Sequence, residues 1–91
     1  MMNEYEYVFC KTLHEKLKAK IKGGINAYIT DDTLEIKIIR YGDIIFKMRI
    51  CNISEKILNG YSTDLVVHEV VKKYKRFVLN GHFVCEENGS V

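Results

Sequence analysis

Three stretches in the first half of the chain alternate apolar with other residues, and this period of two constrains the fold more than any other feature. They cover residues 25–30, 34–39 and 44–50. A period of two predicts strands that bury one face. Asp31-Asp32 and Tyr41-Gly42-Asp43 separate the stretches and are typical turn residues. The sequence therefore predicts a three-stranded antiparallel meander.

Helical periodicity flanks this meander on both sides. Before it, apolar residues spaced by three and four predict an amphipathic helix from Asn3 to Lys22. After it, Asn52 and Glu55 have the spacing of a capping box, which predicts the start of a short helix. Ser62 is expected to cap a last helix, whose apolar residues fill an arc of roughly 140°. These residues are Val66, Val67, Val70, Val71, Tyr74, Phe77 and Val78.

The elements predict an α+β fold, a single small domain of order α-β-β-β-α-α. The apolar strand faces need cover, and the helix stripes supply it, so we expect a three-stranded antiparallel sheet with helices on one face. A chain of 91 residues has room for one core, so residues 1–91 are expected to form one domain with an ordered part of about 3–85. His82–Cys85 is expected to add a short edge strand or to cover the core, and residues 86–91 are expected to fray. A domain of this size is modestly stable alone, which leaves a homodimer open.

Composition narrows the class of protein. Hydrophobic residues make up 47% and charged residues 29% of the chain, the balance of an ordinary globular domain. No stretch approaches the ~18 apolar residues that a membrane span needs, and the first residues do not resemble a signal peptide. The three cysteines contain no CxxC pair, which favours free thiols in a reducing compartment. We therefore expect a cytoplasmic protein without a membrane partner.

Motifs for catalysis or cofactor binding are absent from the sequence. It contains no GxxxxGK[ST], GxGxxG or GxSxG, and its serines occupy predicted cap or tail positions. Cys10 and His14 could join His82 and Cys85 as a zinc-type ligand set. Both cysteines lie in apolar surroundings, however, where a free cysteine behaves as a small hydrophobe. We expect no enzyme, no cofactor and no metal.

Surface charge is the best functional signal. In the last helix Lys72, Lys73, Lys75 and Arg76 are predicted to share the solvent side with His68. On the outer sheet face, Lys37, Lys47 and Arg49 are predicted to lie around Tyr28, a mixture of cations and an aromatic that suits single-stranded nucleic acid. Lysines near a helix C-terminus also complement the helix dipole, so a structural explanation stays open. The order α-β-β-β-α matches the double-stranded RNA-binding fold, but Asp64 stands near the start of the last helix, where that family binds phosphates.

The second half of the chain carries a resemblance. The stretch Ile53–Ser62, continued by the apolar spacing of the last helix, resembles small proteins encoded in phages and prophages of low-GC Gram-positive bacteria. The element order is similar to that of some type II-A anti-CRISPR proteins, which implies stoichiometric inhibition of a Cas9 nuclease through protein contact. A net charge of +2 argues against mimicry of the DNA backbone.

Three hypotheses follow. In the first, the chain is a non-enzymatic phage-encoded protein that binds and inhibits or modulates a host protein, such as a bacterial defence component, in the host cytoplasm. In the second, it is a nucleic-acid-binding phage accessory protein that uses the basic last helix. In the third, it is a sponge that holds a small molecule or signalling nucleotide in a cleft.

Overall fold

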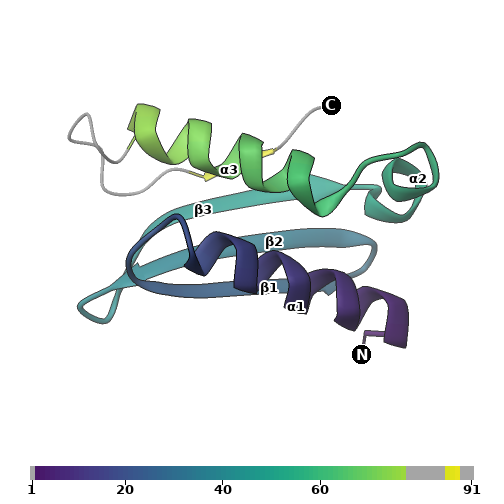
Figure 1. Cartoon of the computed structure of the whole chain (residues 1–91), viewed down its shortest axis with the longest axis horizontal. Coiled ribbons are helices and arrows are strands. Elements are labelled where there is room, and N and C mark those ends of the chain that lie inside the picture. The colour runs from purple at the N-terminus through teal and green to yellow at the C-terminus, as the bar shows by residue number, and fades with distance from the viewer. Residues whose placement is uncertain (1, 78–85, 89–91) are drawn as a thin grey trace.

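A sheet and a layer of helices make up the fold in the computed structural model, which describes residues 2–77 and 86–88. The elements are α1 (Glu4–Lys18), β1 (Gly24–Thr30), β2 (Thr33–Arg40), β3 (Asp43–Cys51), α2 (Ile53–Leu58), α3 (Thr63–Phe77) and β4 (Glu86–Asn88). Figure 1 shows the helices over one face of the sheet. The predicted α+β order, with one helix, three antiparallel strands and then two helices, is confirmed.

The meander is joined by two tight turns. Thr30 pairs with Thr33 across Asp31-Asp32, and Arg40 pairs with Asp43 across Tyr41-Gly42. All four turn residues have positive φ, as the two-residue turns that suit twisted hairpins require. A bulge between Ile38 and Ile39 shifts the β2–β3 register near the second turn.

A short fourth strand extends the sheet beyond the prediction. β4 pairs with β3 in parallel, with Glu86 opposite Lys47 and Asn88 opposite Arg49. The sequence predicted fraying from residue 86, so the pairing of 86–88 is a difference from that expectation. β3 would otherwise be an edge strand with unpaired backbone groups, and a returning segment can pair with these. The strand expected over His82–Cys85 lies outside the described residues.

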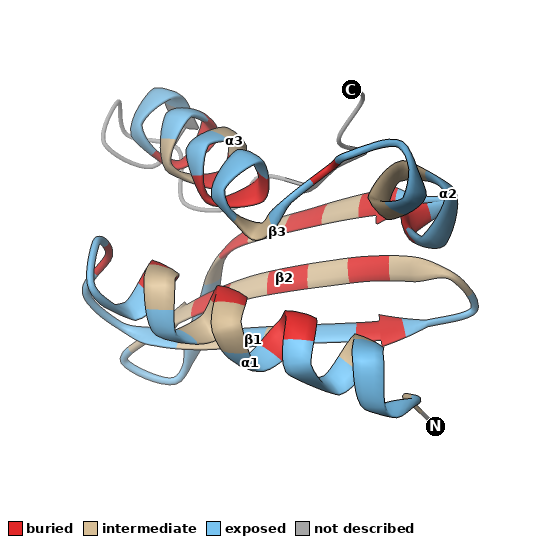
Figure 2. Ribbon diagram, turned by 45° about the vertical axis from the view of Figure 1, so that its right-hand side comes forward, coloured by how far each residue is buried: buried red, intermediate tan, exposed pale blue. Residues whose placement is uncertain are grey.

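The core lies between the sheet and the helices. Figure 2 shows buried residues alternating with less buried ones along β2 and β3, and buried residues on α1 and α3. Alternate residues of the two central strands face each other across the register, as in the pair Ile36 and Met48, and both are fully buried. Phe46 meets Tyr74 of α3 edge to face, with 6.1 Å between the ring centroids. The fully buried helix residues that cover these strands include Leu13, Leu17, Val66 and Val70.

The start of α2 differs from the sequence prediction, whereas Ser62 caps α3 as predicted, with its hydroxyl accepting a hydrogen bond from the Leu65 amide at 3.4 Å. The capping box predicted at Asn52 is wrong, because Asn52 has a left-handed backbone (φ 54°) and its side chain makes no capping hydrogen bond. Asp32 of the β1–β2 turn takes this role, since its carboxylate accepts a hydrogen bond from the Ser54 amide at 3.0 Å. A capping box does occur in α1, where Asn3 and Glu6 bond each other's backbone amides.

Helix α1 is shorter than predicted. It ends at Lys18 rather than Lys22. Ile21 is nevertheless buried, because a turn closed by its amide and the Leu17 carbonyl at 2.9 Å carries it back to the core. The apolar spacing in the sequence therefore extends to Ile21, beyond the last residue of the helix.

Helices α1 and α3 run in roughly the same direction, from the end of the molecule near α2 toward the end with the β2–β3 turn (Figure 1). They touch where Lys16 of α1 reaches the start of α3, with its ammonium 2.8 Å from the Asp64 carboxylate and 2.7 Å from the Thr63 hydroxyl. Within the described residues, no helix has the length and apolar character needed to cross a membrane.

Candidate binding surfaces

The face of the sheet opposite the helices carries charged residues from β2 and β3. Glu35 lies between cations: Nε of Arg49 is 2.9 Å, Nζ of Lys37 is 3.2 Å and Nζ of Lys47 is 3.9 Å from its carboxylate. Tyr28 is the β1 partner of Glu35 and is partly exposed. The structure thus brings together the four sheet residues singled out in the sequence.

Glu35 organises this face electrostatically. The hydrogen bond from Arg49 holds the pKa of Glu35 below its ordinary value, and Lys37 and Lys47 add to the effect while partial burial opposes it. Lys37 and Lys47 are direct cross-strand partners, so without Glu35 two like charges would face each other. The three cations of this cluster are therefore already engaged with a carboxylate of the sheet.

The cations of α3 do not all face solvent. His68, Lys72, Lys75 and Arg76 are exposed, as predicted, but Lys73 is only 9% exposed. The prediction for Lys73 is wrong because this residue follows Val66 by seven positions, which returns it to the same side of the helix as the core. Lys73 is therefore not available to a partner on the solvent side.

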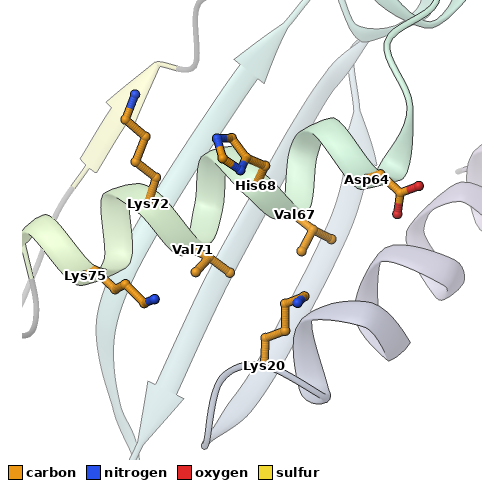
Figure 3. A pocket seen from close by; sticks show the side chains of 7 residues that line it. All are labelled: Lys20, Asp64, Val67, His68, Val71, Lys72 and Lys75. Atoms are coloured by element: carbon orange, nitrogen blue, oxygen red, sulfur yellow. The ribbon is translucent and has the colours of Figure 1, made fainter.

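A basic groove lies between the solvent side of α3 and the connection that follows α1. It has a volume of about 480 Å³, and Lys20, Asp64, Val67, His68, Val71, Lys72 and Lys75 line it. Figure 3 shows Val67 and Val71 pointing from α3 into the space toward Lys20. Asp64 at the rim is neutralised by Lys16. The groove therefore combines an apolar floor with lysine side chains that make no ion pair within the described part of the chain.

At the opposite end of the helices, large apolar side chains are exposed, and the sequence reasoning missed them. Tyr5 and Val8 of α1, Leu58 of α2 and Leu65 of α3 are between 48% and 86% exposed. Tyr5 lines both of two adjoining grooves of about 420 and 510 Å³. Tyr61 lines the first of these and a third groove that reaches Leu65. We call these four exposed residues and the grooves between them the apolar surface.

The border of the apolar surface carries more acidic than basic residues, with Glu6 lining one groove and Lys56 another. Glu4 and Glu6 occupy the first turn of α1, and Glu55 that of α2. The signal for this surface was in the sequence, because Tyr5 and Val8 fall outside the stripe formed by Phe9, Leu13 and Leu17. Apolar residues off the buried stripe of an amphipathic helix indicate a contact other than the core.

Cys10 and Cys51 line neither the basic groove nor the grooves of the apolar surface, whereas His68 belongs to the basic groove. Cys10 is buried in the core, and this burial, with a contribution from Glu6, raises the pKa of its thiol to about 11. Cys51 is exposed at the end of β3. Within residues 2–77 and 86–88, no group of three His, Cys, Asp or Glu residues is placed to hold a metal ion. His82 and Cys85 of the zinc-type set weighed above lie outside this part of the chain.

A comparison with protein-family models, with curated proteins and with solved structures found no match for this chain. The function is therefore argued from the surfaces themselves.

Proposed function

We propose that this chain is a non-enzymatic binding protein that inhibits or modulates another protein by stoichiometric contact through the apolar surface. The observation that carries the proposal is the grouping of four large, exposed apolar residues from three helices around adjoining grooves. Water-exposed apolar groups of this size lose contact with water when a partner covers them, and this favours association. In line with the resemblance described above, the partner we propose is a host protein of a Gram-positive bacterium, such as a defence component.

The surface has features of a protein contact. Aromatic and large aliphatic anchors at the centre of an interface carry most of its binding free energy, and a polar border surrounds them. Tyr5, Val8, Leu58 and Leu65 supply the anchors, and the acidic first turns of α1 and α2 supply the border. The proposed partner surface is accordingly apolar at its centre and basic at its edge.

The test compares variants in affinity purification from a Gram-positive host lysate. Leu58→Glu combined with Leu65→Glu places two charges in the apolar surface, and because both residues are exposed the fold should stay intact. We expect one protein to be recovered at one copy per chain by the wild type and to bind the double variant at least about 30-fold more weakly. Phage plating on a defence-bearing host should show a matching loss of protection.

The matched control is Tyr7→Gln combined with Lys11→Gln, two exposed positions of α1 outside the apolar surface. This control should recover the same protein as the wild type. Recovery of no specific protein by the wild type, or equal recovery by the Leu58/Leu65 variant with an unchanged circular dichroism spectrum, would contradict the proposal. Sedimentation of the purified chain measures its oligomeric state. If the wild type is a dimer and the Leu58/Leu65 variant is a monomer, a second copy of the chain covers the apolar surface instead.

A further inference from the structure

Positive charge gathers where the connection that follows α1 lies across from the second half of α3, a region that we call the basic end. The last turn of α1 carries Lys16 and Lys18, and that of α3 carries Lys75 and Arg76. Lys20 and Lys22 extend the series into the connection between α1 and β1. The last turn of α1 reaches only the start of α3, where Lys16 pairs with Asp64, so Lys16 is not part of the basic end.

The β2–β3 turn joins this basic end. Nε of Arg40, the last residue of β2, donates a hydrogen bond to the Lys22 carbonyl at 3.1 Å. This bond ties the turn to the connection after α1. A path of cations therefore runs from Lys72 and Lys75 in the groove, across Lys20, to Arg40 at the turn.

Tyr41, at the tip of that turn, has an unfavourable backbone conformation and an unfavourably exposed aromatic ring. Its side chain is fully exposed, and its backbone is left-handed with φ 54°. Residues other than glycine, asparagine and aspartate rarely adopt this backbone conformation, because the β-carbon crowds the neighbouring carbonyl. An aromatic ring that is wholly in water at a strained position contributes nothing to the fold, so a contact with a partner is the better explanation.

We infer that this end of the molecule binds single-stranded nucleic acid, with Tyr41 stacking on a base and Lys20, Lys72 and Lys75 neutralising phosphates. Cations along a groove combined with an exposed aromatic ring are the features of sequence-tolerant single-strand binding. The groove floor of Val67 and Val71 offers apolar contact that a base can use and a phosphate cannot. In a duplex the bases are already stacked, so Tyr41 favours the single strand.

Complementing the helix dipoles explains only part of this arrangement. That effect accounts for cations in the last turns, such as Lys75, and fades beyond them. It does not account for Tyr41 or for the placement of Lys20 opposite α3. The inference goes beyond the proposed protein contact, since it uses a different end of the molecule and different residues.

The test is fluorescence anisotropy with labelled oligothymidylate and oligouridylate of about 20 nucleotides, titrated with the full chain between about 50 and 200 mM salt. Tyr41→Asn removes the ring and places in the turn a residue that tolerates left-handed backbone, so the fold is kept. Lys20→Gln combined with Lys75→Gln removes two phosphate contacts. The controls are Tyr7→Gln and Lys11→Gln, an exposed tyrosine and an exposed lysine elsewhere on α1.

We expect wild-type binding to weaken with salt and Tyr41→Asn to weaken it roughly 5-fold to 100-fold. The lysine pair should reduce the slope of log affinity against log salt by about 1.4, and the controls should change neither quantity. Three results would overturn the inference: no wild-type binding at low salt, equal binding of a duplex of the same length, or unchanged binding by Tyr41→Asn. None of them bears on the protein contact, which is read from the Leu58/Leu65 variant.

Discussion

Glu35→Gln removes the negative charge around which three cations of the sheet's open face are arranged, and we expect it to lower the free energy of unfolding at neutral pH. The carboxylate lies 2.9 Å from Arg49, 3.2 Å from Lys37 and 3.9 Å from Lys47. With the Glu35 side chain 26% exposed, each ion pair is worth about 0.2–1 kcal/mol. Glutamine keeps an oxygen that can accept the Arg49 hydrogen bond, but it removes the carboxylate charge that lies between the cross-strand partners Lys37 and Lys47.

The sum of these effects is a loss of about 1–2 kcal/mol. For a domain of this size such a loss corresponds to a fall in melting temperature of roughly 5–15 °C. High salt should shrink the difference between the two proteins, because it screens charges that are partly exposed to water.

The pH dependence has a defined sign. The pKa of Glu35 is lower in the folded chain than in the unfolded chain, so its ionised form stabilises the fold above the unfolded pKa. This contribution is lost as the pH falls through the folded pKa, because the protonated glutamate is then as uncharged as glutamine. The two stability curves should therefore differ at pH 7 and converge in acid.

Urea denaturation followed by circular dichroism, at pH 7 and at successively lower pH, measures this directly. Glu15→Gln is the control, since Glu15 is an exposed glutamate of α1 without an ion pair among the described residues. Equal stability of wild type and Glu35→Gln at pH 7, or a difference that persists undiminished in acid, would refute the account of Glu35 as the centre of this cluster.

Three further outcomes follow from single side chains. The Tyr61 hydroxyl is buried without a hydrogen-bond partner among the described residues, so Tyr61→Phe should raise the free energy of unfolding by about 1 kcal/mol, and a lower urea midpoint would contradict this. Tyr41→Asn should also raise it by about 1 kcal/mol, because it relieves the left-handed backbone, and the same denaturation series detects the change. Peptide mass spectrometry after iodoacetamide treatment should find Cys51 alkylated quickly in the folded chain and Cys10 only on unfolding, since Cys10 is buried with a pKa raised to about 11, and equal rates would count against the placement of Cys10 in the core.

The sheet could be predicted from the sequence because its information is local. Alternation with a period of two residues indicates which residues share a face of the sheet. A two-residue turn then sets the register of the strands on either side. Lys37, Lys47 and Arg49 therefore lie on the open face, as predicted. The same reasoning placed Leu34 and Ile36 in the core, where both are fully buried.

Lys73 shows where the local signal was available and was misread. At 100° per residue Lys73 lies about 20° beyond Val66, at the border of the apolar arc of α3. A long lysine side chain can cover apolar surface with its methylene groups. Because Lys73 stands among other basic residues, the prediction placed it with them on the solvent side and overlooked its position around the helix axis.

Other features could not be predicted, because they depend on parts of the chain that meet only after folding. Asp32 caps the start of α2 from a turn some twenty residues earlier, with its carboxylate accepting the Ser54 amide. β4 pairs with β3 in parallel, and a pattern of only three residues, Glu86–Asn88, carries no recognisable strand signal. Local periodicity cannot predict contacts between segments that lie far apart in the sequence.

The two proposed surfaces arise in the same way, from the directions of the helices. α1 and α3 each begin with acidic residues and end with basic ones, a distribution that helix dipoles favour in any sequence. The helices run the same way but are staggered, so the basic last turn of α1 meets the acidic start of α3, where Lys16 pairs with Asp64. The acidic start of α1 and the basic end of α3 stay apart, and Leu58 of α2 adds apolar surface near the first of these ends. The separation of charge is thus a product of the packing, and it allows one small domain to offer two chemically different surfaces.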